Sequence, residues 1–82
     1  MEFQLAVRLR LKEGTLDPEA EVIQKALEKL GFTGIRELRQ EKSFLIRVDA
    51  ETQDAALQSG RQMAQKLLAN LVMEDFEVEI VA

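Results

Sequence analysis

The last quarter of the chain changes its hydrophobic period, and this change restricts how the whole sequence can fold. In residues 63–71, apolar side chains recur every three or four positions, as they do on one face of a helix. From Phe76 onward, apolar side chains alternate with glutamates, as in a strand with one buried face. Between them lies Asn70, which tolerates positive φ and is expected to end the helix. This succession predicts a helix and a strand that cover each other's apolar faces.

The N-terminal part shows the same two patterns in the opposite order. Residues 3–12 alternate without interruption between apolar side chains and polar or small ones, which predicts a strand. Gly14 is expected to turn the chain, because glycine readily takes positive φ. Asp17 and Pro18 then predict the start of a helix, and Gly31 predicts its end. The residues expected to form its buried stripe are Ala20, Ile23, Ala26, Leu27 and Leu30.

Residues 35–48 allow two interpretations. A single strand would be long against the usual length of about 3–10 residues, so it would need a bulge. A hairpin would need a turn near residues 40–42, which lack the Gly or Asn that tight hairpins prefer. Asp49 or Thr52 is then expected to cap a second helix that runs to about Ala69. The residues predicted to form the inner stripe of this helix are Ala56, Gly60, Met63, Ala64, Leu67 and Leu71.

The order strand, helix, strand or hairpin, helix, strand predicts an α+β two-layer sandwich. We expect an antiparallel sheet with two helices on one face, as in the ferredoxin-like β-α-β(-β)-α-β arrangement. Residues 1–82 are expected to form a single domain. Such a short chain buries only about 60% of the surface that its unfolded form exposes. It has no cysteine or histidine, so disulfides and the commonest metal ligands are excluded, and association with other chains is the expected source of stability.

The composition also argues against several classes of function. A net charge of −4 disfavours a surface that binds nucleic acid. No apolar run approaches the ~20 residues of a membrane span and no signal peptide is evident, so we expect a cytoplasmic protein. Ser43 and Ser59 have no base nearby in the sequence. Glu74-Asp75, and Asp17 with its neighbouring glutamates, could bind a metal, but a solvated turn and a helix cap explain them more simply. We expect no catalytic, cofactor or metal site on this chain.

The outward face of the predicted sheet carries the candidate site. Arginines of the first and middle strands share this face with glutamates of the last strand, so cross-strand ion pairs are expected if the last strand pairs with the first. Such pairs are worth at most about 1 kcal/mol each on a solvated face. Apolar residues among the charges make a subunit interface an equally open interpretation. The candidate interface residues are Ala6, Arg8, Arg10, Leu45, Arg47, Glu77, Glu79 and Val81.

Three stretches of the sequence resemble the PurS family, the small subunit of phosphoribosylformylglycinamidine (FGAM) synthase in organisms that divide this enzyme into several chains. These stretches are residues 11–18, beginning Leu-Lys-Glu-Gly-Thr, residues 26–32, and residues 67–76. They occur in the family's order and cover the domain. Many members have Val, Gly, Cys, Pro and Tyr at positions that are here Thr15, Glu41, Ala64, Leu71 and Phe76. These differences concern turn, cap and packing residues.

The resemblance implies a non-catalytic assembly subunit. PurS proteins bridge a glutaminase subunit, PurQ, and a synthetase subunit, PurL, and support the transfer of ammonia between them. The partner subunits use glutamine and ATP with Mg to convert formylglycinamide ribonucleotide to FGAM in purine biosynthesis. The family also implies self-association as a dimer or tetramer, without cofactors on this chain.

Two other interpretations of the residues stay open. One is a regulatory domain of the ACT type, with a small-molecule site where the loop Glu13-Gly14-Thr15 meets a partner helix. The other is an independent enzyme, which the lack of a nucleophile–base pair disfavours.

Overall fold

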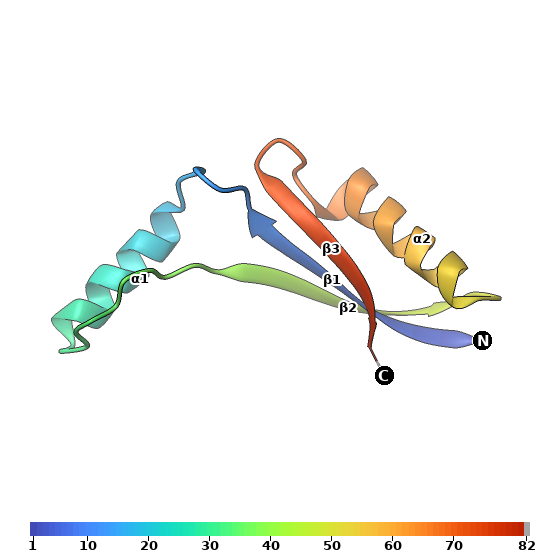
Figure 1. Cartoon of the computed structure of the whole chain (residues 1–82), viewed down its shortest axis with the longest axis horizontal. Coiled ribbons are helices and arrows are strands. Elements are labelled where there is room, and N and C mark those ends of the chain that lie inside the picture. The colour runs from blue at the N-terminus through green and yellow to red at the C-terminus, as the bar shows by residue number, and fades with distance from the viewer. Residues whose placement is uncertain (82) are drawn as a thin grey trace.

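A computed structural model describes residues 1–81 of the chain, which form one three-stranded sheet and two helices (Figure 1). The central strand is β1, and it pairs antiparallel with β2 on one side and β3 on the other. A π-helical segment, η1, continues α2. The predicted α+β class and antiparallel sheet are confirmed. The elements are β1 (Glu2–Leu11), α1 (Pro18–Lys29), β2 (Glu41–Asp49), α2 (Gln53–Met63), η1 (Ala64–Leu68) and β3 (Glu74–Val81).

The core lies between the sheet and α2. The strict alternation of β1 turns Leu5, Val7 and Leu9 to the inner face, where all three are essentially inaccessible to solvent. The helix meets them with small residues, because Ala56 and Ala64 are fully buried and Gly60 is buried between them. This part of the predicted inner stripe is confirmed.

The interval between α2 and the sheet is too small for a side chain at Gly60. A Cβ placed there would lie 2.8 Å from Cγ1 of Val78 and 3.0 Å from Cδ1 of Leu5. The predicted close approach is therefore present, and glycine's cost of about 1 kcal/mol in a helix interior accompanies it.

Residues 35–48 form neither the long bulged strand nor the hairpin that the sequence allowed. The strand begins only at Glu41, and its first ladder partner is Arg10, close to the end of β1. Residues 32–40 lie beyond the end of β1, so no neighbouring strand is available to pair with them. The length of β2 is therefore limited by the length of its partner, which an alternating pattern alone does not reveal.

The predicted ends of α1 are confirmed. Asp17 is the N-cap, and its Oδ1 accepts a hydrogen bond of 3.1 Å from the backbone N–H of Ala20. At the other end Gly31 has φ of 98°, and the backbone N–H of Phe32 donates to the carbonyl of Leu27 over 3.1 Å. This is the bonding pattern of a helix that ends through a left-handed glycine.

The position of α1 differs from the expectation that both helices share one face of the sheet. Figure 1 shows α1 beyond the end of the sheet, on the side away from α2, with residues 32–40 returning alongside it. The Nε2 of Gln24 donates to the carbonyl of Ile35 over 3.4 Å across this pair of segments. Of the predicted stripe only Ala20 is fully buried. The other members stay accessible because α1 lies against this return segment and not against the sheet. We call residues 16–40 the arm.

The arm makes the molecule elongated. The radius of gyration of the whole molecule is 16.3 Å, whereas about 12 Å is expected for a compact chain of this length. Its principal extents are 51, 27 and 15 Å.

The end of the second helix corrects two expectations. In η1 the backbone N–H of Ala69 donates to the carbonyl of Ala64, so the last turn contains one residue more than an α-helical turn. The apolar stripe shifts accordingly, and Leu68 packs against the core while Leu67 is 84% exposed. Leu71 is exposed as well, so these two members of the predicted inner stripe were wrong.

Asn70 does not adopt the predicted positive φ, which in residues 1–81 occurs only at glycines. Its side chain instead accepts a hydrogen bond of 3.1 Å from the backbone N–H of Val72. Asn70 thus shapes the turn between η1 and β3 through its side chain.

We predict that Gly60→Ala lowers the stability of the fold. Val78 is β-branched and cannot rotate away easily, and overpacking costs typically about 1–3 kcal/mol, which outweighs the gain of about 1 kcal/mol in helix propensity. Urea unfolding measures the difference. Ser59→Ala, at the neighbouring exposed position, is the control and should be neutral or slightly stabilising. An unfolding midpoint of Gly60→Ala at or above wild type would contradict this close contact.

We also predict opposite outcomes for two identical truncations. Leu9→Ala should destabilise the chain by about 2–5 kcal/mol, because this side chain is 1% exposed. Leu67→Ala should change stability by less than about 0.5 kcal/mol, as expected for an exposed position. Thermal unfolding of both variants at one protein concentration measures this. Equal losses would place Leu67 in the core and contradict the shift of the stripe.

Candidate functional site

The outer face of the sheet brings together the eight residues predicted as a subunit interface. In the ladder, Ala6 lies between Leu45 of β2 and Glu79 of β3, and Arg8 lies opposite Glu77. Arg47 and Val81 flank Gln4 in the same way. The β1 positions alternate with the buried Leu5, Val7 and Leu9, and the positions on β2 and β3 lie opposite β1 residues of the outer face. The sequence therefore predicted correctly which side chains share this face.

The predicted cross-strand ion pairs form, and they run diagonally. Arg8 pairs with Glu79, and Arg10 pairs with Glu77 over 3.4 Å; each glutamate lies two residues along β3 from the residue directly opposite the arginine. Two further ion pairs were not predicted from the sequence, Arg10 with Glu41 and Arg47 with Glu2, both at 3.9 Å. The parity of Glu41 on β2 was the available signal for the first of them. All these side chains are about half exposed or more, so each pair contributes little to folding.

Of the apolar surface predicted among these charges, only part is exposed. Leu45 is 68% exposed on β2, whereas Ala6 in the centre is only 3% exposed. Val81 is half-buried at the edge. The outer face is thus a charged surface whose arginines are each paired with a glutamate, with one exposed leucine.

The arm carries a second surface, made of exposed apolar side chains, and this exposure was not predicted from the sequence. Ile23 and Leu30 are seven residues apart and so lie on one side of α1, and Leu16 lies in the segment just before the N-cap. Leu16 is 79% exposed, Leu30 is 74% and Ile23 is 39%. Phe32, just after the helix, is also exposed. We call these four residues the arm stripe. The spacing was visible in the sequence, but it could not show that the sheet leaves this stripe uncovered.

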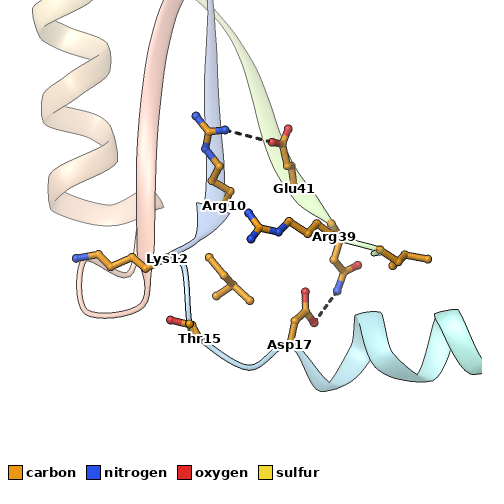
Figure 2. A pocket seen from close by; sticks show the side chains of 10 residues that line it. Arg10, Lys12, Thr15, Asp17, Arg39 and Glu41 are labelled. Carbon is orange, nitrogen blue, oxygen red and sulfur yellow. Dashed lines mark hydrogen bonds and ion pairs between the residues drawn. The ribbon is translucent and has the colours of Figure 1, made fainter. Parts of the chain in front are cut away.

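A small cleft lies where the arm joins the sheet, between the end of β1 and the start of β2 (Figure 2). Figure 2 shows Arg10, Lys12 and Arg39 around it, together with Asp17 and Glu41. Its volume of about 220 Å³ is below the range of about 300–1,000 Å³ that is usual for small-molecule sites. Gly14 and Thr15 also line the cleft, and they belong to the loop where the alternative ACT interpretation would place a small-molecule site against a partner helix.

The acidic residues considered as metal ligands have structural contacts. Oε1 of Glu74 accepts a hydrogen bond of 2.8 Å from the backbone N–H of Asn70, which holds the turn before β3. Asp17 caps α1 and also accepts a hydrogen bond of 3.3 Å from Nε2 of Gln40. Across residues 1–81, no three His, Cys, Asp or Glu side chains are grouped as a metal ion would require. Within the same residues no helix combines the length and apolar character needed to cross a membrane.

The chain is similar to known proteins over nearly its whole length. Residues 4–82 match the family model described as PurS, phosphoribosylformylglycinamidine (FGAM) synthase. The PurS subunit of Methanocaldococcus jannaschii is 35% identical over 78 residues, which are 95% of this chain and 94% of that protein. The corresponding subunit of Mycobacterium leprae is 39% identical over 72 residues, covering 88% of this chain and 87% of the other.

Solved structures agree with these sequences. The crystal structure of Methanocaldococcus jannaschii PurS superposes with a TM-score of 0.86 at 34% identity, covering 99% of this chain and 96% of that one. A chain of the PurLQS structure from Thermotoga maritima gives a TM-score of 0.90 at 29% identity, covering 99% of both chains. The sequence match and the shared fold lead to one conclusion: this chain belongs to the PurS family of FGAM synthase subunits.

Proposed function

We propose that this chain is the small, non-catalytic subunit of an FGAM synthase and that it joins a glutaminase subunit to a synthetase subunit. The observation that carries this proposal is the similarity along 99% of the chain to a component of PurLQS from Thermotoga maritima. A subunit that bridges two enzymes needs external surfaces and not a reaction centre. The described residues provide such surfaces on the outer face of the sheet and on the arm.

The chemistry belongs to the partner subunits in this proposal. The glutaminase releases ammonia from glutamine, and the synthetase uses ATP with Mg to place that ammonia on formylglycinamide ribonucleotide. Residues 1–82 act as one domain that aligns the two, in the cytoplasm where these metabolites are found, and the chain associates with itself as a dimer or tetramer. The family assignment favours this role over an ACT-type regulatory domain.

The outer face of the sheet is the proposed contact with another subunit. Arg8, Arg10 and Arg47 each pair with a glutamate of the same face, so a partner that covers these arginines leaves none of them without a counter-charge. Leu45 supplies an exposed apolar anchor beside them. This surface would give specificity through charge and affinity through the leucine.

We predict that the purified chain shows neither glutaminase nor ATPase activity. Added to the glutaminase and synthetase subunits, it should increase glutamine-dependent FGAM synthesis at least about tenfold. The reason is that ammonia then passes between two aligned sites within one complex and does not have to diffuse through solution. Synthesis from free ammonium should increase much less, since ammonium reaches the synthetase without the glutaminase. Equal stimulation of both reactions would contradict a role in joining the subunits.

We predict that Arg8→Glu weakens binding to the partner subunits at low ionic strength. The substituted carboxylate would lie beside Glu77 and Glu79, and the unpaired negative charge should repel an interface that matched the original pairs. The effect should decrease in about 1 M salt, where the screening length falls to about 3 Å. Isothermal titration calorimetry against the partner subunits measures it.

Two variants separate this effect from a change in folding. Arg8→Glu with Glu79→Arg restores an internal ion pair in reversed order and should keep the melting temperature of wild type. Lys25→Glu makes the same change of charge on exposed α1, away from the outer face, and should bind normally. Unchanged affinity of Arg8→Glu at low salt would show that the outer face is only solvated.

A further inference from the structure

Exposed apolar side chains are concentrated in the turn that follows the second helix. Figure 1 shows this turn at the end of the sheet, between η1 and the start of β3. Within residues 67–73, Leu67, Leu71, Val72 and Met73 are all exposed, and Val72 is 85% exposed. Single apolar residues are normal on a protein surface, whereas a group of neighbouring ones marks an interaction site. We call these four residues the turn patch.

The end of the helix directs one member of the turn patch outward. In an unbroken α-helix, Leu67 would continue the buried stripe of Gly60 and Ala64. The wider turn of η1 places Leu68 against the core and leaves Leu67 in solvent. Such π-helical turns occur frequently at functional sites. The local geometry therefore adds a leucine to the exposed turn.

Hydrogen bonds hold the turn in one shape before any partner binds. The carbonyl of Asn70 accepts hydrogen bonds from the backbone N–H groups of Met73 over 3.0 Å and Glu74 over 2.7 Å, and its side chain accepts one from Val72. The backbone N–H of Lys12 donates to the carbonyl of Met73 over 2.8 Å, which fixes the turn to the end of β1. A preordered loop loses little conformational entropy on binding, so it is well suited to anchor a partner.

Two lysines near the turn patch have no counter-charge. Lys66 and Lys12 are exposed, and neither makes an ion pair within residues 1–81. Figure 2 shows the side chain of Lys12 directed away from the cleft. Glu74 is half-buried and accepts the hydrogen bond from Asn70, and Glu13 on the adjoining loop pairs with neither lysine. Carboxylates on a partner would complement these free ammonium groups.

The turn patch is separate from the outer face of the sheet. Leu45, the apolar anchor of that face, lies level with Glu79 in the ladder, and β3 begins five residues earlier at Glu74. Five residues of a strand span about 17 Å. A subunit that joins two enzymes needs two contacts that do not overlap, and this spacing provides a second one.

We propose that the turn patch is the second docking surface of this chain and inserts into an apolar pocket, bordered by carboxylates, on one catalytic subunit. The other catalytic subunit lies on the outer face of the sheet. An apolar centre with a polar rim is the usual composition of a protein interface. This inference rests on the proposed bridging function and specifies its second contact.

Photo-crosslinking identifies the occupant of the turn patch directly. We replace Val72 with p-benzoylphenylalanine and irradiate the mixture of all three subunits with glutamine and ATP with Mg. We expect a single main product, joined to one catalytic subunit, and mass spectrometry should place the bond in a pocket with apolar and acidic side chains. The same group at Gln58, exposed on α2 away from the turn, should give at least about tenfold less product, since the reaction requires close contact.

Three crosslinking results would overturn the proposal. A product that joins two copies of this chain would make the turn patch a self-contact. A yield no higher than that of the Gln58 control would leave the turn without a partner. A bond to a surface rich in lysine and arginine would contradict the acidic border.

Substitutions provide a second measurement that does not depend on crosslinking. Val72→Glu places a charge in the apolar pocket and should weaken binding to the crosslinked subunit at least about tenfold. Gln58→Glu adds the same charge elsewhere and should bind as wild type does. Circular dichroism and sedimentation should show the wild-type fold and oligomer for both, because each position is exposed. Wild-type affinity of Val72→Glu would overturn the proposal.

Lys66→Glu tests the charge of the pocket border. It should weaken binding at low ionic strength, and the difference from wild type should shrink in about 1 M salt, where the screening length is about 3 Å. Lys25→Glu, on α1, is the control and should bind normally. Unchanged or tighter binding of Lys66→Glu at low salt would contradict an acidic border.

Failure of this inference differs from failure of the proposed function. If wild-type chain binds both catalytic subunits and Val72→Glu binds them equally well, the bridging function stands and the turn patch is not its second contact. If wild-type chain binds neither subunit, the bridging function itself is overturned and the inference with it.

Discussion

The burial of β1 is the constraint on which the rest of the structure depends. This strand is the hydrogen-bonding partner of both neighbouring strands, and its buried Leu5, Val7 and Leu9 form the surface against which α2 packs. Because each of its side chains belongs strictly to one face, the inner face is fixed as apolar and the outer face as charged. The surfaces available for partners follow directly from this separation.

The sequence predicted those features that depend on neighbours in the chain. The alternation of β1, the Asp17 cap and the glycine end of α1 are local signals, and the structure has all three. The outer-face pairs of Arg8 and Arg10 also followed from parity, once the order of strands was assumed. The hydrophobic pattern could not predict properties that depend on distant parts of the fold. The extra residue in η1 moved Leu67 outside, and β2 began where its partner ended.

The position of α1 shows the same limit most clearly. Its apolar spacing is genuine, but a hydrophobic stripe indicates only that a helix needs a partner and not which chain provides it. In this chain one side of the helix is covered by the return segment and the other is exposed. Leu16 and Leu30 therefore stay exposed in the isolated chain. This agrees with a family whose members work as subunits.

The proposed role of this chain is to join two enzymes physically. Native mass spectrometry of the three purified subunits tests this role directly. With all three present, we expect a particle that contains the glutaminase, the synthetase and at least two copies of this chain. With this chain omitted, the two larger subunits should appear separately at the same micromolar concentrations. If the glutaminase and the synthetase associate equally well without this chain, the chain does not bridge them and the proposed role is contradicted.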